Sequence, residues 1–259
     1  MYPVIVCIAK KEHDYIEEFV DYHLRLGFKH IFLYDNEDVP TYWEMLQKYK
    51  SNITVMHLPH NNYHKGVQYV ALDHFISKYL FHTPTTHVAH IDVDEFIVLK
   101  RHTNIEDFID EFIVGNCQGI GMNWRFFGSS GHTEKINTPV THRFTKCQKQ
   151  GNPHIKTLFK KDYFLNYLTC HDVKLSQGHI KSTNHHIIQG PFNHHIDFSV
   201  IQLNHYKCKT LPEFRYIRTR QRADINGTIH ENVDEQFKQY DINEMDEYTA
   251  CEFYQTQNI

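Results

Sequence analysis

The chain has 259 residues, of which 41% are hydrophobic and 14% aromatic, so it can bury a sizeable core and disorder is not expected. Its 31 acidic and 27 basic residues give a formal net charge of -4 with no block of like charges, which argues against a nucleic-acid-binding surface and a polybasic membrane anchor. The six cysteines form no C-x-x-C pair, so zinc-ribbon and thioredoxin-like motifs are excluded and reduced thiols are the default.

The first third of the chain alternates apolar, strand-like stretches with segments of helical spacing. The expected strands cover residues 4–9, 29–34, 53–58 and 88–99, and the expected helices cover residues 14–27, 41–49 and 67–80. Strand, helix and strand at this spacing imply parallel pairing through right-handed crossovers, and therefore a doubly wound sheet. The apolar N-terminal strand is too short to cross a bilayer and has no basic start, so no transmembrane segment is expected.

The second half of the chain is less regular. The expected helices cover residues 105–114, 211–222 and 233–240, and the expected strands cover residues 119–124, 155–160 and 199–206. The polar, histidine-rich stretch 169–195 has weak periodicity and is expected to form loops. We predict one α/β domain over residues 1–225 and a C-terminal helical extension over residues 226–259, packed on the same domain. The expected location of this soluble protein is the cytoplasm, that of a host cell included, or the periphery of a membrane.

The stretch 88–99 is an apolar run interrupted by carboxylates. An apolar run this short, with β-branched residues on both sides, indicates a strand buried on both faces. On an extended backbone Asp92 and Asp94 leave the same face, with their Cα atoms roughly 6–7 Å apart. Two carboxylates this close repel each other unless a cation lies between them. Because open α/β sheets bind ligands at the carboxyl ends of their strands, the position favours a metal site over a simple acidic turn.

Short motifs along the chain form a further pattern. They are residues 9–12 (AKKE), 15–19 (YIEEF), 22–28 (YHLRLGF), 32–36 (FLYDN), 91–96 (IDVDEF), 124–129 (WRFFGS), 156–159 (KTLF) and 204–206 (NHY). In their joint order and spacing they resemble glycosyltransferase family 92 and its family 2-like relatives, over about residues 3 to 222. Lys11 departs from the pattern, because the family usually has Asn at this position.

The resemblance implies a GT-A fold: a Rossmann-like, mostly parallel central sheet flanked by helices, with a smaller, loop-rich acceptor region. It implies transfer of a sugar from a nucleotide-sugar, most often a UDP-sugar, to a hydroxyl acceptor on a glycan or glycoprotein, with inversion as the expected course. It also implies Mn²⁺ or Mg²⁺ held by Asp94 and steadied by Asp92, to neutralise the leaving diphosphate. His205 resembles the histidine that closes such a metal site, although with 22 histidines a surface or core role fits it equally.

The nucleotide is expected along the ends of the first strands, which meet at one edge of the sheet. The candidate residues for the nucleotide and diphosphate are Ala9, Lys10, Glu12, Asp35, Asn36, Lys65, Gln68, Asp92, Arg125 and Lys156. Asp35 is favoured over Glu12 for a base or ribose contact, because Glu12 also fits a charge at a helix N-terminus. Arg125 and Lys156 suit residual phosphate charge, but solvated or ion-paired roles fit them equally.

An inverting transfer needs a base that takes the proton of the acceptor hydroxyl. We take Asp172 as the candidate base, with His171 orienting it or binding the acceptor; a turn in which Asp172 caps a strand end is the alternative. Trp124, Phe126 and Phe127 are candidates for a platform under the apolar face of a sugar ring, or else core aromatic residues.

Two other functions remain open on the residues alone. A nucleotidyltransferase acting on a sugar phosphate would also use paired carboxylates and a metal, but it would normally carry a glycine-rich, basic loop after the first strand. Residues 9–13 contain no glycine. A non-catalytic sugar-binding module on the same scaffold would be expected to have lost its metal site, and Asp92 and Asp94 are both present.

Overall fold

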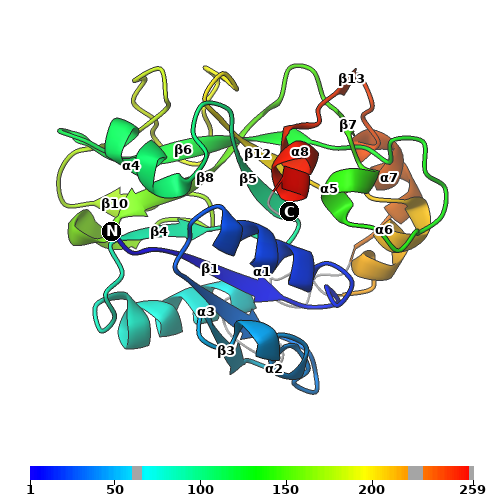
Figure 1. Cartoon of the computed structure of the whole chain (residues 1–259), viewed down its shortest axis with the longest axis horizontal. Coiled ribbons are helices and arrows are strands. Elements are labelled where there is room, and N and C mark those ends of the chain that lie inside the picture. The colour runs from blue at the N-terminus through cyan, green and yellow to red at the C-terminus, as the bar shows by residue number, and fades with distance from the viewer. Residues whose placement is uncertain (60–65, 221–229, 257–259) are drawn as a thin grey trace.

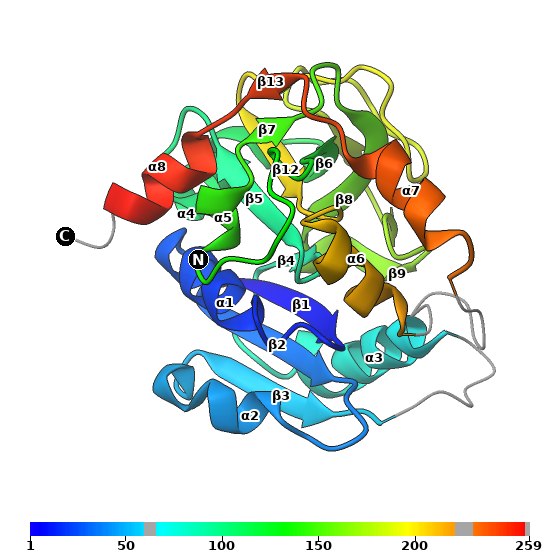
Figure 2. The ribbon, with the colours of Figure 1, turned by 90° about the vertical axis from the view of Figure 1, so that its right-hand side faces the viewer.

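The computed structural model describes residues 1–59, 66–220 and 230–256. In this part of the chain the centre is a large, curled, mixed sheet with the strand order β3-β2-β1-β4-β8-β6-β12-β5, and β11 pairs with β6. Helices flank the sheet, and the C-terminal helix α8 lies beside α5, which comes from the middle of the chain (Figure 1, Figure 2). This architecture confirms the predicted α/β class.

Apart from the stretch 88–99, the predicted strands and helices are present with shifts at their ends, and several short elements were not predicted. The elements of the first part are β1 (Pro3–Ala9), α1 (Ile16–Arg25), β2 (His30–Asp35), α2 (Tyr42–Met45), β3 (Ile53–His57), α3 (Val67–Phe75) and β4 (His87–His90). Those of the second part are β5 (Glu95–Leu99), α4 (Ile105–Phe112), β6 (Cys117–Phe126), α5 (Val140–Arg143), β7 (Lys146–Cys147), β8 (Asn152–Lys160), β9 (Phe164–Tyr167), β10 (Val173–Leu175), β11 (His179–Lys181), β12 (Ile201–His205), α6 (Leu211–Arg218), α7 (Val233–Tyr240), β13 (Met245–Asp246) and α8 (Thr249–Thr256). Among the described residues, no helix has the length and apolar character needed to span a bilayer.

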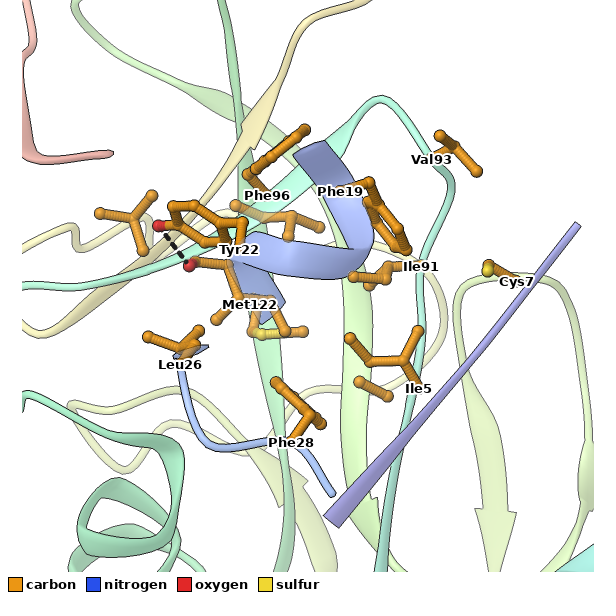
Figure 3. Packing of buried hydrophobic residues seen from close by; sticks show 14 of the residues in the cluster. Ile5, Cys7, Phe19, Tyr22, Leu26, Phe28, Ile91, Val93, Phe96 and Met122 are labelled. Carbon is orange, nitrogen blue, oxygen red and sulfur yellow. Dashed lines mark hydrogen bonds between the residues drawn. The ribbon is translucent and has the colours of Figure 1, made fainter. Parts of the chain in front are cut away.

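The strand β1 is buried on both faces. It pairs in parallel with β2 on one side and β4 on the other. Val4 and Val6 belong to the core that includes the apolar residues of α3, whereas Ile5 and Cys7 belong to the core that includes those of α1. Figure 3 shows Ile5 and Cys7 in the same cluster as Phe19 of α1. Because successive side chains of a strand point to opposite faces, β1 joins the two cores.

The stretch 88–99 is not one strand, contrary to the prediction. It forms two strands at different places in the sheet: β4 pairs with β1 and β8, whereas β5 pairs with β12 at one edge. Ile91 and Val93 of the connection belong to the core, with 0% and 2% exposure (Figure 3). Asp92 and Asp94, which alternate with them, stay outside the apolar cluster. One strand cannot pair with β1 and β8 and also with β12 at the edge of the sheet, so β4 and β5 are separate strands joined by a connection.

The sheet is only partly parallel. Five of its eight strand pairings are parallel, including those among β1, β2, β3 and β4, while β8 is antiparallel to both β4 and β6 and β5 is antiparallel to β12. The stretch 169–195 contains the short strands β10 and β11 besides its loops, and β11 extends the central sheet. The second half of the sheet therefore departs from simple strand–helix–strand repetition.

The segment that follows residue 230 packs against the rest of the chain. The strand β13 pairs with β7, and α7 packs against α6. Nζ of Lys100 lies 2.6 Å from Oε2 of Glu247, and the hydroxyl of Tyr254 donates to Asp21 of α1 at 2.9 Å. These contacts join the C-terminal elements to the sheet and to α1.

We expect the protein to lose stability on mild acidification. Burial is the main cause that lowers the pKa of His23 to about 3, of His87 to about 4 and of His90 to about 3. The unfolded chain takes up these protons below about pH 6.5 while the folded chain does not, so the free energy of unfolding falls as the pH drops from about 6.5 toward 4. Each histidine contributes up to about 1.4 kcal/mol per pH unit in this window.

The measurement is urea unfolding at pH 7 and pH 5. The variant His23→Gln should have a shallower pH dependence than the wild type, because it removes one of the groups that titrate only in the unfolded chain. Equal unfolding free energies of the wild type at the two pH values would contradict the assignment.

Candidate active site

Main-chain pairing brings Asp94 and His205 together. In the antiparallel ladder of β5 and β12, His205 lies opposite Glu95, and the N–H of Tyr206 donates to the carbonyl oxygen of Asp94 at 2.8 Å. Nε2 of His205 lies 3.6 Å from Oδ1 of Asp94, and the two side chains are 5% and 12% exposed. This separation is too long for a hydrogen bond, but it suits two ligands of one cation.

Asp94 and His205 are in the protonation states that metal ligands need. Burial works against ionisation of Asp94, yet His205 and the cations Lys209 and Arg220 hold its pKa well below the usual value. Burial lowers the pKa of His205 against the opposing effect of Asp94, so the imidazole is mainly neutral at pH 7. Its Nδ1 is buried and has no hydrogen-bond partner among the described residues. A carboxylate and a neutral imidazole form a donor pair that fits Mn²⁺, and carboxylates also fit Mg²⁺.

Asp92 points to other partners. Its Oδ1 accepts a hydrogen bond from Nε2 of Gln68 at 3.2 Å, and its Oδ2 lies 3.1 Å from Nζ of Lys156. Within the described residues, no group of three or more His, Cys, Asp and Glu side chains is arranged to hold a metal ion. A cation held by Asp94 and His205 would therefore take further ligands from substrate phosphates and water, as protein-bound Mg²⁺ usually does.

Lys156 lies beneath the connection between β4 and β5. The pairing of β8 with β4 carries Lys156 there, and its Nζ is 3.1 Å from Asp92 and 3.8 Å from Glu95. Burial raises the pKa of Glu95 well above the usual value, whereas Lys156 lowers the pKa of Asp92 against the effect of burial. The negative charge of this group therefore resides on Asp92. Lys156, a candidate for phosphate contact, is committed to Asp92 in this structure.

The loop after β1 is held by the end of α6, which Figure 2 shows above the C-terminal end of β1. Nη1 of Arg220, just beyond α6, donates to the carbonyl oxygen of Lys10 and to Oε1 of Glu12, both at 2.6 Å. Glu12 is 2% exposed, and its Oε2 has no hydrogen-bond partner among the described residues. Burial raises the pKa of Glu12, while Arg220 and Lys209 lower it and Asp94 raises it further. Glu12 and Asp94 are therefore neighbours in one charged cluster.

Asp35 and Asn36 tie β2 to its neighbours. Asp35 is fully buried, and its two carboxylate oxygens accept hydrogen bonds of 2.8–3.1 Å from three backbone N–H groups, one in the loop after β2 and two at the start of α2. The N–H of Asn36 donates to the carbonyl oxygen of Ala9 at 2.9 Å, and its Nδ2 donates to that of Leu58 at 2.7 Å. Asp35, favoured from the sequence for a base or ribose contact, thus has its carboxylate bonded to backbone N–H groups in this structure, whereas Asp94 is among the charges that raise the pKa of Glu12.

Arg125 is occupied by protein groups away from Asp94. Its Nη1 donates to Oε1 of Gln202 at 3.0 Å and lies 3.3 Å from Glu247, and its other nitrogens donate to the carbonyl oxygens of residues 148 and 149. It therefore links β6 and β12 to the C-terminal segment. The remaining candidate, Lys65, lies outside the described residues.

His171 and Asp172 have different surroundings. The carboxylate of Asp172 accepts a hydrogen bond from the hydroxyl of Thr169, which makes it part of a turn. Nδ1 of His171 lies 2.9 Å from the carbonyl oxygen of Ile155. Because a carbonyl oxygen can only accept, Nδ1 carries the hydrogen and Nε2 keeps its lone pair. Burial, assisted by the charge of Lys156, lowers the pKa of His171 to about 4, so the ring is neutral at pH 7.

Trp124 lies between His205 and His171. Its ring centroid is 4.5 Å from that of His205 and 5.2 Å from that of His171. Phe126 also contacts His205, with the centroids 5.2 Å apart, whereas Phe127 is 1% exposed and packs in the core against Tyr206. Of the three aromatic candidates, Trp124 and Phe126 line the ligand pair and Phe127 is a core residue.

Sequence reasoning missed Lys209 and Arg220. Both contribute to the low pKa of Asp94, and Lys209 also acts on Glu12. Lys209 follows His205 by four residues, so its position just after the NHY motif was a signal that could have identified it. Arg220 is one of several basic residues around α6, and the sequence does not distinguish it from them.

The structure is an α/β fold in which the carboxylate of Asp94, just before β5, lies 3.6 Å from the imidazole of His205, at the end of β12. The model of the family described as glycosyltransferase family 92 matches residues 2–250. The chain therefore belongs to glycosyltransferase family 92, as the motifs predicted. A comparison with the curated proteins finds no match.

Several solved structures share part of the fold at low identity. Residues 1–349 of TarS from S. aureus match with 13% identity and a TM-score of 0.36, over 63% of this chain and 48% of that chain. The same part of TarS in complex with UDP-GlcNAc matches with 18% identity and a TM-score of 0.33, over 52% of this chain and 37% of that chain. HddC from Yersinia pseudotuberculosis matches with 12% identity and a TM-score of 0.37, over 66% of this chain and 82% of that chain. The chain thus spans about half the length of the first of these structures.

The variant Lys11→Asn should be more stable than the wild type. Lys11 has φ of 59°, in the left-handed region that Asn tolerates better than Lys, and Asn is the residue that the family usually has there. We expect a gain of roughly 0.5–1 kcal/mol in the free energy of unfolding, since the exposed contact of Lys11 with Thr219 offsets only part of the relief. Urea unfolding measures it, with Lys10→Asn as the control that should gain nothing. A Lys11→Asn variant no more stable than the wild type would contradict this reason for the family's Asn.

Lys156→Met should destabilise the protein by about 1–3 kcal/mol, because it leaves the Asp92 carboxylate without its charged partner. The double variant Lys156→Met with Asp92→Asn should recover part of that loss, since both charges of the pair are then absent. Urea unfolding of the two single variants and the double variant completes the cycle. If the double variant lost as much unfolding free energy as the two single variants together, the ion pair with Asp92 would not be the reason for the burial of Lys156.

Proposed function

We propose that this enzyme transfers a sugar from a nucleoside-diphosphate sugar, a UDP-sugar as the first candidate, to a hydroxyl acceptor on a glycan or glycoprotein, with inversion at the anomeric carbon. The observation that carries the proposal is the pairing of an ionised Asp94 with a neutral His205 at 3.6 Å, at the ends of two neighbouring strands. Family membership supplies the reaction class, and this pair supplies the place where a diphosphate would bind.

Asp94 and His205 would hold a divalent cation, Mn²⁺ or Mg²⁺, together with diphosphate oxygens. When bound, such a cation acts as a Lewis acid that neutralises the charge of the departing nucleoside diphosphate. Asp92 is 36% exposed in its side chain and is fixed by Lys156 and Gln68. Its free lone pairs are available to a sugar or ribose hydroxyl, which suits the shared role expected for the first acid of the motif.

On the acceptor side, His171 is better placed than Asp172 to take a proton. Nε2 of His171 has a free lone pair, whereas the Asp172 carboxylate is bound by Thr169 and fixes the turn that carries His171. The acceptor hydroxyl would donate its proton to Nε2 as its oxygen attacks the anomeric carbon. Trp124, in contact with both His171 and His205, offers its ring to the apolar face of the sugar.

We expect UDP to stabilise the protein only when Mn²⁺ or Mg²⁺ is present. At a concentration about 100 times the dissociation constant a ligand adds about 2.7 kcal/mol, which for a chain of this size raises the melting temperature by roughly 5–10 °C. Asp94→Asn and His205→Gln should abolish the shift, because each removes one proposed ligand of the cation. Asp234→Asn is the matched control, because Asp234 is an exposed residue paired with Arg215.

Two outcomes of this thermal-shift series would count against the proposal. Stabilisation by UDP that is the same with and without metal, and that persists in Asp94→Asn, would remove the metal assignment. If the wild type gave no shift with UDP under any condition, the choice of a uridine donor would be wrong.

A further inference from the structure

Lys209 is a buried cation whose ammonium group lacks a hydrogen-bond partner. It is 1% exposed, and Nζ forms no hydrogen bond with any of the described residues. Its observed contact is with the ring of Tyr15, with Nζ 4.3 Å from the ring centroid. Lysine is almost never buried without a charged or hydrogen-bonding partner, because desolvation of the ammonium group is costly. The fold alone therefore does not account for Lys209.

The ammonium group belongs to the charged cluster around Asp94. Lys209 is one of the cations that hold down the pKa of both Asp94 and Glu12. Arg220, the other cation of this cluster, already donates to Glu12 and to the carbonyl oxygen of Lys10. The N–H groups of the Lys209 ammonium are therefore available to a ligand, whereas Nη1 of Arg220 is already bound to protein oxygens.

The nearby helix end offers nothing to an anion. The N-terminus of α6 begins directly after Thr210, whose side chain and backbone form a reciprocal capping box with Glu213. Glu213 brings a carboxylate to the first turn, and Arg143 lies 2.9 Å from it. At the start of α6, the group that suits an anion is thus the ammonium group of Lys209, and not the end of the helix.

We infer that Nζ of Lys209 binds the terminal phosphate of a nucleoside diphosphate whose other phosphate oxygens face Asp94 and His205. The inference rests on the proposed function and adds to it the protein group that binds the diphosphate. A compact ammonium with three donors suits phosphate oxygens, and a phosphate group satisfies a lysine and a divalent cation together. The binding of this anion would supply the hydrogen bonds that Lys209 lacks in the ligand-free protein.

The test compares Lys209→Met with the wild type by calorimetric titration of UDP, inorganic diphosphate and uridine, each with Mn²⁺. Loss of a charge-assisted hydrogen bond should weaken UDP and diphosphate about 10- to 100-fold and leave uridine unchanged. Lys209→Arg, which keeps the charge, should recover part of the affinity. Lys146→Met is the matched control for net charge, since Lys146 is an exposed residue 3.9 Å from Asp246, and it should bind like the wild type.

Stability provides the second readout. Removing Lys209 ends the cost of burying an ammonium group without hydrogen bonds, but it also removes a cation that lowers the pKa of Asp94 and Glu12, so the melting temperature of the ligand-free Lys209→Met variant should change little. A purely structural role would show a clearly lower melting temperature, with all three ligands weakened together. That outcome would overturn the inference.

The outcomes separate this inference from the proposed function. If the wild type binds UDP and Lys209→Met binds it equally well, the Lys209 inference fails and the proposed function stands. If the wild type binds inorganic diphosphate through Lys209 but does not bind UDP, the inference stands and the uridine donor is wrong. If the wild type binds neither UDP nor diphosphate, both fail.

Discussion

The candidate active site depends on the buried ammonium group of Lys156. Three carboxylates follow one another within four residues between β4 and β5, and burying even one unpaired ion costs several kcal/mol. Nζ of Lys156 lies 3.1 Å from Asp92 and 3.8 Å from Glu95, while burial raises the pKa of Glu95. The buried cation on β8 thus neutralises Asp92 and leaves Asp94 to pair with His205. Without it, the connection between the two strands would carry more negative charge than this environment accommodates.

The local parts of the fold followed from the sequence, and the long-range parts did not. The elements from β1 to α3 were predicted because apolar periodicity and short connections are local properties of the chain. The break in the stretch 88–99 was not predicted, because it depends on β5 pairing with β12, more than a hundred residues further along. A short apolar run has the same residue pattern whether it forms one buried strand or two strands at different places in the sheet. The pairing partner, which the pattern does not encode, decides between them.

The same reasoning explains which site residues could be predicted. Asp94 and His205 were predicted because they lie in motifs that occur in a fixed order along the chain. The structure brings these two residues together. For Asp35 the sequence could not decide, because an aspartate after a strand is suited both to a ligand and to capping the backbone of the next helix. In this structure its carboxylate accepts hydrogen bonds from backbone N–H groups at the start of α2. Arg220 reaches the cluster from just beyond α6, and nothing in the sequence distinguishes it from the other basic residues there. Lys209 lies just after the NHY motif, which was a signal that could have identified it.

The charged cluster around Asp94 lowers the stability of the fold, because it buries charged groups with atoms that lack hydrogen-bond partners in the described part of the chain. Lys209 lacks a hydrogen-bond partner among the described residues, Glu12 has an unpaired carboxylate oxygen, and Asp94 is held ionised although it is nearly buried. A sequence selected only for stability would pair or replace such groups, and local rules of this kind are broken mainly where function requires it. Under the proposed function, a diphosphate would give Lys209 hydrogen-bond acceptors and a cation would offset the charge of Asp94, whereas either one alone would leave part of the cluster uncompensated. The proposal therefore includes joint binding of anion and metal, whichever sugar the nucleotide carries.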